Sequence, residues 1–245
     1  MYLGLRGQNY LRTFPFGQGW GFGTVNPKIW EDWFDDDIRK TGSIFNVTNR
    51  NEVVLYTFGA DSHVDETSYV QKKYIPINVY ADGTHTVVHN YSMELYGNTV
   101  DNYMLNNTQD LVLIRFADVL LMAAELNLGT AKAQSFLDRV RARVNLPSVP
   151  ATLDNIKAER RFELAFEGVR FYDLLRWHDA DRVLNENQKD IVIYRSRTET
   201  VTKTITYRPE TNGFLQIPLS EIELSKGVLT ANPGWGSEAA YQDIY

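Results

Sequence analysis

Cysteine is absent from this 245-residue sequence, and its absence excludes several kinds of chemistry. Disulfides, thiolate metal sites, cysteine nucleophiles and a lipid-modified cysteine all require this residue. No segment approaches the roughly 20 consecutive apolar residues of a membrane-spanning helix, and the N-terminal MYLGLRGQNY lacks the apolar core of a signal peptide. The sequence therefore predicts neither a membrane helix nor a cysteine-based function in this chain.

A surplus of positive charge is also missing. The chain has 25 Lys and Arg against 31 Asp and Glu, whereas proteins that neutralise a phosphate backbone carry clustered cations. The glycine-rich GQGWGFG at 17–23 is not followed by the Lys-Ser/Thr of a P-loop, and no serine nucleophile elbow is present. These absences argue against nucleic acid as a partner and against the common nucleotide and serine-hydrolase sites.

Apolar residues recur with helical spacing from about residue 110. The first stripe contains Leu113, Phe116, Ala117, Leu120, Leu121 and Ala124, and the second contains Ala133, Phe136, Leu137, Val140 and Val144. The turn at Gly129 between them predicts two antiparallel helices of about 34 residues in total, the length of a tetratricopeptide unit. A third helix is expected to begin at the N-cap Thr152 and to bury Phe162, Ala165, Phe166 and Val169.

The remaining segments indicate loops and short strands. Between 53 and 105, short apolar runs alternate with Gly, Asn and Asp, and from 191 to 208 β-branched residues alternate around a polar centre. The second pattern predicts an exposed β-hairpin. We therefore expect a loop-rich, aromatic-rich part at 1–110 and a helical region at 111–245 with a polar hairpin near 191–208.

Nine aromatic residues lie within the first 34 positions. Flat rings stack on the apolar faces of sugars, so Trp20, Trp30 and Trp33 are candidate glycan-binding residues. The alternative for Trp30, Trp33 and Phe34 is the core stripe of a short helix, because they are spaced at i, i+3 and i+4. Trp20 lies between Gly19 and Gly21 and fits no such stripe.

Two sets of acidic residues are candidates for chemistry. Glu159, Glu163 and Glu167 are spaced four apart, which permits the paired carboxyls of a glycosidase, but Arg160, Arg161 and Arg170 are interleaved with them. Neighbouring cations keep carboxylates ionised, so structural ion pairs are the expected role. Within Asp35-Asp36-Asp37, the carboxylates of Asp35 and Asp37 are weak candidates for calcium ligands, and an acidic loop is the alternative.

Four segments in order resemble the C-terminal half of the SusD/RagB family. They are LIRFADVLLMAAELN (113–127), FLDRVRARVNLP (136–147), ERRFELAFEGVRFYDLLRW (159–177) and FLQIPLSEIELSKGVLTANPGW (214–235). Before residue 110 the resemblance is loose. Gln216 and Ser225-Lys226 depart from the residues that such proteins often carry at these positions.

The resemblance implies a mainly α fold: tetratricopeptide-like helical hairpins with a loop-rich, partly β ligand-binding part. It also implies a non-catalytic, cofactor-free protein that binds oligosaccharide at the outer-membrane surface and delivers it to a SusC-like TonB-dependent transporter. Family members are longer and lipid-anchored, so we expect this chain to be the C-terminal portion of a longer lipoprotein. The alternatives are an α-helical glycoside hydrolase using Glu163 and Glu167, and a non-catalytic peptide-binding repeat scaffold.

Overall fold

The computed structural model describes residues 15–17, 19–48, 56–59, 65–80, 88–90, 95, 97 and 110–236. The chain divides into two compact units. Unit 1 comprises residues 1–170 and 191–203, and unit 2 comprises residues 171–190 and 204–245. Residues on both sides of position 110 therefore belong to unit 1.

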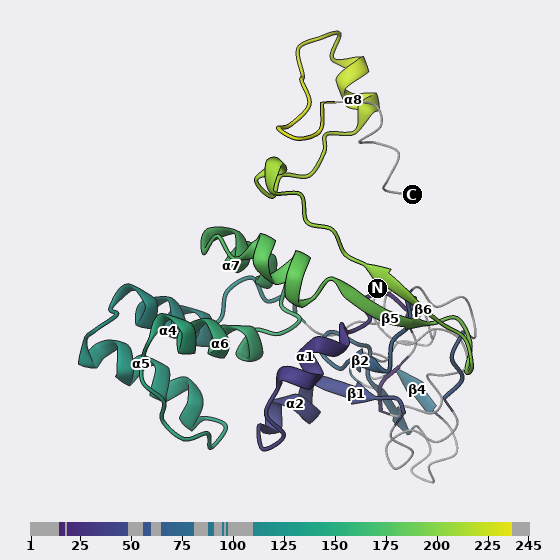
Figure 1. Cartoon of the computed structure of the whole chain (residues 1–245). Coiled ribbons are helices and arrows are strands. Elements are labelled where there is room, and N and C mark those ends of the chain that lie inside the picture. The colour runs from purple at the N-terminus through teal and green to yellow at the C-terminus, as the bar shows by residue number, and fades with distance from the viewer. Residues whose placement is uncertain are drawn as a thin grey trace. The chain divides into compact units, whose positions relative to one another are not determined.

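The predicted helical hairpin is confirmed as α4 (Phe116–Leu126) and α5 (Ala131–Ala142) (Figure 1). Gly129 has φ +79° in the connection, and Thr130 caps α5 by accepting a hydrogen bond from the Ala133 amide. The two helices bury a shared apolar core that also receives one residue of α6: Leu120, Leu121, Ala124, Leu137, Val140 and Ile156. Leu113, the first residue of the predicted apolar stripe, is not part of this core, because it precedes α4 and is 79% exposed.

The third helix, α6 (Leu153–Glu163), begins at the predicted cap, where Thr152 accepts from the Asn155 amide. It ends earlier than the periodicity predicts, since Phe166 has φ +67° and Gly168 has φ +79°. The left-handed backbone at Phe166 interrupts the helix. Phe162 and Ala165 are buried as expected, whereas Phe166 and Val169 lie beyond the helix and are half-buried.

Two short helices and a two-stranded sheet complete the described core of unit 1. Helix α1 (Pro27–Asp32) starts at the N-cap Asn26, and α2 (Ile38–Ser43) starts at the N-cap Asp37. Strand β1 (Ile44–Asn46) follows α2 directly and pairs antiparallel with β2 (Tyr69–Gln71). One core cluster joins these elements to the end of α6: Val25, Trp33, Ile44, Phe162 and Ala165.

Two further strand pairs lie in loop-rich regions. Strand β3 (Asn78–Tyr80) pairs antiparallel with β4 (Val88–Asn90). Strands β5 (Asp190–Tyr194) and β6 (Thr200–Thr204) form the predicted hairpin near 191–208. The sequence also predicts other short strands between 53 and 105, and many positions of this range lie outside the described residues.

Unit 2 contains short helical segments and a small core of its own. Its elements are α7 (Arg170–Arg176), which begins at the unit boundary, a π-helical turn (Arg182–Asn187), a 3₁₀ turn (Pro209–Thr211) and α8 (Leu219–Leu224). Leu174, Ala180 and Val183 form the buried core of this unit. Asn212 and Gly213 both have positive φ, as a tight turn requires.

The architecture is mainly α with small two-stranded sheets, as predicted. Among the described helices, none combines the length and the hydrophobicity needed to cross a membrane.

Candidate functional site

The three glutamates of the ladder lie at the centre of a buried network of ion pairs in unit 1. Glu159 and Glu163 are on α6 and are 2% exposed, and Glu167 follows the helix. Glu159 bonds Arg39 at 2.6 Å and Arg141 at 2.5 Å. The expected structural role of the ladder is thereby confirmed for Glu159.

Glu163 has the largest number of cationic partners among the three. Its carboxylate accepts hydrogen bonds from Arg39 at 2.7 Å, from Arg115 at 2.6 Å and from Arg143 at 2.7 and 2.8 Å. Glu167 accepts from Lys73 at 2.7 Å and from Arg115 at 2.6 Å. Arg115 therefore bridges Glu163 and Glu167.

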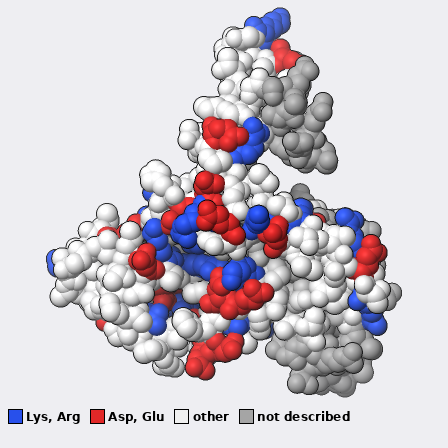
Figure 2. Space-filling view, in the orientation of Figure 1, with Lys and Arg blue, Asp and Glu red and all other residues white. Residues whose placement is uncertain are grey.

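The cations come from segments far apart in the chain. Arg39 is on α2, Arg115 is the N-cap residue of α4, Arg141 is on α5, Arg143 is its C-cap residue and Lys73 follows β2. The arginines next to the ladder in sequence have other partners instead: Arg160 pairs with Asp118 and Arg161 with Asp32, each at 2.7 Å. The network consequently ties α6 to α2, α4 and α5. Figure 2 shows Lys and Arg beside Asp and Glu over the region of α1 and α6.

The surroundings keep Glu163 ionised. Burial by itself would raise the pKa of Glu163, but hydrogen bonds from Arg115 and Arg39 outweigh that effect and the pKa lies below its ordinary value. Burial lowers the pKa of Lys73, and the hydrogen bond to Glu167 opposes this effect. A general acid needs a carboxyl with a raised pKa, so the environment of Glu163 opposes that role.

A cavity of about 370 Å³ lies over this network. Charged side chains line one part of it, and Ile38, Val144 and Phe162 contribute apolar surface. No pattern in the sequence predicts this cavity, because its lining residues come from α2, the segment after β2, the residue before α4, the end of α5 and α6. A pair such as Arg39 and Glu163 is separated by 124 positions, and no local spacing relates two such residues.

The three candidate tryptophans have different environments. Trp20 is half-buried next to Gly21, whose φ is +77°. Trp30 on α1 is also half-buried; its ring stacks on Tyr69 at 5.0 Å, and the Lys40 ammonium lies 4.5 Å from its centroid. Trp33 is only 2% exposed and packs against Phe162 at 5.0 Å.

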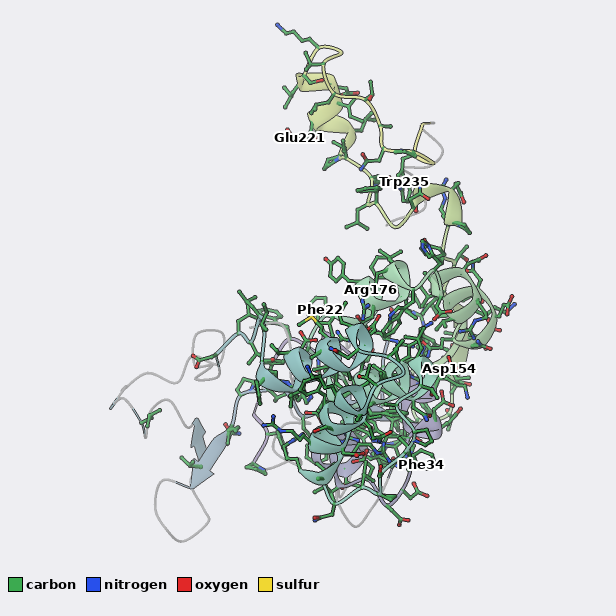
Figure 3. All side chains as sticks on the ribbon, turned by 90° about the vertical axis from the view of Figure 1, so that its left-hand side faces the viewer. Phe22, Phe34, Asp154, Arg176, Glu221 and Trp235 are labelled. Atoms are coloured by element: carbon green, nitrogen blue, oxygen red, sulfur yellow. The ribbon has the colours of Figure 1, made fainter. Side chains whose placement is uncertain are left out.

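The core alternative therefore describes Trp33, whose ring is enclosed and has no face available to a sugar, and in part Trp30, which packs against the same core cluster. It does not describe Phe34, which is 72% exposed at the surface of unit 1 (Figure 3). Phe22 is a further exposed ring in the same aromatic segment, at 46% (Figure 3). Among the aromatic residues at 20–34, Trp20, Phe22, Trp30 and Phe34 keep accessible surface and Trp33 does not.

The two calcium candidates face different partners. Asp37 is 2% exposed and its carboxylate accepts from the Trp33 indole at 2.8 Å and from Arg39 at 2.7 Å. Burial would raise the pKa of Asp37, but the bonds from Arg39 and Trp33 lower it. Asp35 is exposed and pairs with Lys40 at 2.6 Å. In the described parts of the chain, no three His, Cys, Asp or Glu side chains are grouped as metal ligands.

Comparison with solved structures and curated proteins identifies relatives. The laminarin binding SusD-like protein has a TM-score of 0.67 and 32% identity, with 95% of this chain and 43% of that chain covered. Surface glycan-binding protein A from Bacteroides thetaiotaomicron has a TM-score of 0.68 and 25% identity, covering 95% and 45%; its complex with laminarihexaose has a TM-score of 0.65.

SusD-like protein P2 of Formosa agariphila is 25% identical over 201 residues, which cover 75% of this chain and 36% of P2. The chain thus spans less than half the length of each of these relatives. The family model described as the SusD family matches residues 13–235. The match includes all four segments that carry the sequence resemblance, and the chain belongs to the SusD family.

Proposed function

We propose that this chain is part of a non-catalytic protein that binds oligosaccharide at the cell surface. The observation that carries the proposal is the likeness to the laminarin binding SusD-like protein, at 32% identity over 95% of this chain. The solved complex of surface glycan-binding protein A with laminarihexaose supports the same class of ligand. Laminarihexaose is therefore the first ligand to test.

The aromatic segment of unit 1 supplies the proposed contacts. Trp20 and Trp30 are half-buried, so each ring is held by its surroundings while part of it stays accessible. Phe22 adds an exposed ring two positions from Trp20. Rigid aromatic rings of this kind can stack on the apolar faces of pyranoses at a small entropic cost.

The non-catalytic part of the proposal depends on the glutamate ladder. The pKa of Glu163 is lowered, which opposes its use as the protonated acid that glycoside hydrolysis requires, and its partner Arg115 also bonds Glu167. A reducing-sugar assay of the purified protein on a glycan panel tests this point. Release of sugar that disappears in Glu163→Gln would favour the hydrolase alternative.

Binding is tested by affinity electrophoresis in gels containing laminarin, with gels of an unrelated polysaccharide as the control. We expect retardation in at least one gel of a wider panel and an unretarded reference protein in all of them. Unretarded migration across the whole panel would count against oligosaccharide binding by this chain.

We further propose an outer-membrane location with a lipid anchor and delivery to a SusC-like TonB-dependent transporter. Membership of the SusD family is what supports this step. Co-purification of the tagged protein from outer membranes in mild detergent tests it. Recovery of a transporter of that class is the expected result, and recovery of none would contradict the delivery step.

A further inference from the structure

The cavity over the glutamate ladder has more positive than negative charge in its lining. Four cations line it, Arg39, Lys73, Arg115 and Arg143, against two carboxylates, Glu163 and Glu167. Behind the lining, Arg39 also pairs with Asp37 and Glu159, and Glu159 pairs with Arg141. In this described cluster five cations therefore face four carboxylates, and one positive charge is left uncompensated.

Among the four cations of the lining, Arg143 is the most exposed and has the most donors without an acceptor in the described residues. Arg39 and Arg115 use all three of their guanidinium nitrogens in hydrogen bonds. Arg143 is 58% exposed at its side chain, and only its Nη2 has acceptors within the described part of the chain. Lys73 is 28% exposed and donates to Glu167 and, at 3.4 Å, to the Glu163 carbonyl.

We propose that this cavity binds an anionic group, a carboxylate or a sulfate, on a small organic molecule, with Arg143 as the main anchor and Lys73 beside it. Nε and Nη1 of Arg143 donate in different directions, so one of them can bond one oxygen of such a group while the Lys73 ammonium bonds another. Ile38, Val144 and Phe162 provide apolar surface for the carbon skeleton that carries it. The volume of about 370 Å³ lies within the range of small-molecule sites.

This site is separate from the aromatic segment and does not rest on the proposed oligosaccharide binding. Two kinds of ligand carry an anionic group of this kind, a charged sugar and a free inorganic ion. Glucuronate and sodium sulfate represent these two sources, and glucose is the neutral control. Isothermal titration at constant ionic strength measures the binding of each probe.

Arg143→Gln removes the anchor, and Arg139→Gln on α5 is the matched control because Arg139 does not line this cavity. We expect saturable binding of glucuronate, no binding of glucose, and a loss of affinity of about tenfold in Arg143→Gln with none in the control. Weaker binding of sulfate than of glucuronate assigns the site to a charged sugar. Sulfate binding as tight as that of glucuronate would show that the carbon skeleton contributes nothing, and it would overturn the proposal of an organic ligand.

Arg143 also bonds Glu163, so a variant that leaves the network intact is needed. Ile38 is 61% exposed and lines the cavity, and Ile38→Glu places a repelling carboxylate there without removing an ion pair. It should weaken glucuronate binding by at least fivefold with an unchanged melting temperature. Absence of saturable binding, or equal affinities for Arg143→Gln and Arg139→Gln, would overturn the proposal.

Discussion

Replacing Glu163 by glutamine probes the ion network that holds α6 against α2, α4 and α5. The side chain of Glu163 is 0% exposed and bonds Arg39, Arg115 and Arg143. Glutamine keeps the shape but removes the charge, and its amide group faces guanidinium groups that can only donate. Breaking a buried ion pair by neutralising one partner costs about 3–5 kcal/mol in general.

The expected cost is at the lower end of that range because two of the three arginines keep other partners. Arg39 retains Asp37 and Glu159, and Arg115 retains Glu167. Arg143 loses its carboxylate but is 58% exposed, so water can solvate it. We expect Glu163→Gln to lower the free energy of unfolding by about 3 kcal/mol, a fall in melting temperature of roughly 6–12 °C.

Urea unfolding followed by tryptophan fluorescence and by circular dichroism measures this change. Glu31→Gln is the control, because Glu31 is exposed and its pair with Lys28 spans 3.9 Å; it should cost less than about 0.5 kcal/mol. A loss in Glu163→Gln no larger than that of the control would refute the structural role of the network.

Three further outcomes are expected. The pKa of Glu163 is lowered in the folded state, so its contribution to stability is present above the unfolded-state pKa of about 4.3 and is lost as the pH falls through the lower folded-state pKa. The free energy of unfolding of the wild type should therefore decrease as the pH falls below about 4.3, and it should decrease less steeply in Glu163→Gln. Equal slopes of unfolding free energy against pH in the two proteins would contradict this. Trp33→Ala should cost about 3–5 kcal/mol because the ring is buried and bonded to Asp37, whereas Phe34→Ala should change thermal melts little. Thr152→Ala removes the cap of α6 and should cost about 1 kcal/mol in the same urea assay.

Local patterns in the sequence predict the helices well because their causes are local. Apolar spacing places α4 and α5, Gly129 places the turn between them, and the Thr152 cap places the start of α6. The end of α6 escapes this reasoning because Phe166 adopts a left-handed conformation that an apolar pattern does not reveal. The pattern continues through Phe166, and the helix does not.

The candidate site was predicted only in part. The ladder was correctly interpreted as ion-paired, but its partners are not the neighbouring arginines; Arg39 and Arg115 reach it through the tertiary fold. Trp33 and Phe34 are adjacent aromatic residues, yet Trp33 is buried against Phe162 of α6 and Phe34 is exposed. Contacts between distant segments decide both outcomes, and no local spacing encodes them.

The proposed oligosaccharide binding is tested most directly by titrating laminarihexaose into the wild-type protein and into Trp20→Ala. Stacking on an indole is worth on the order of 1 kcal/mol, so we expect the variant to bind several-fold more weakly and to melt at the wild-type temperature. If the wild type binds none of a wider oligosaccharide panel, the function proposed here is wrong; if Trp20→Ala binds normally and melts early, Trp20 is a core residue and the site lies elsewhere.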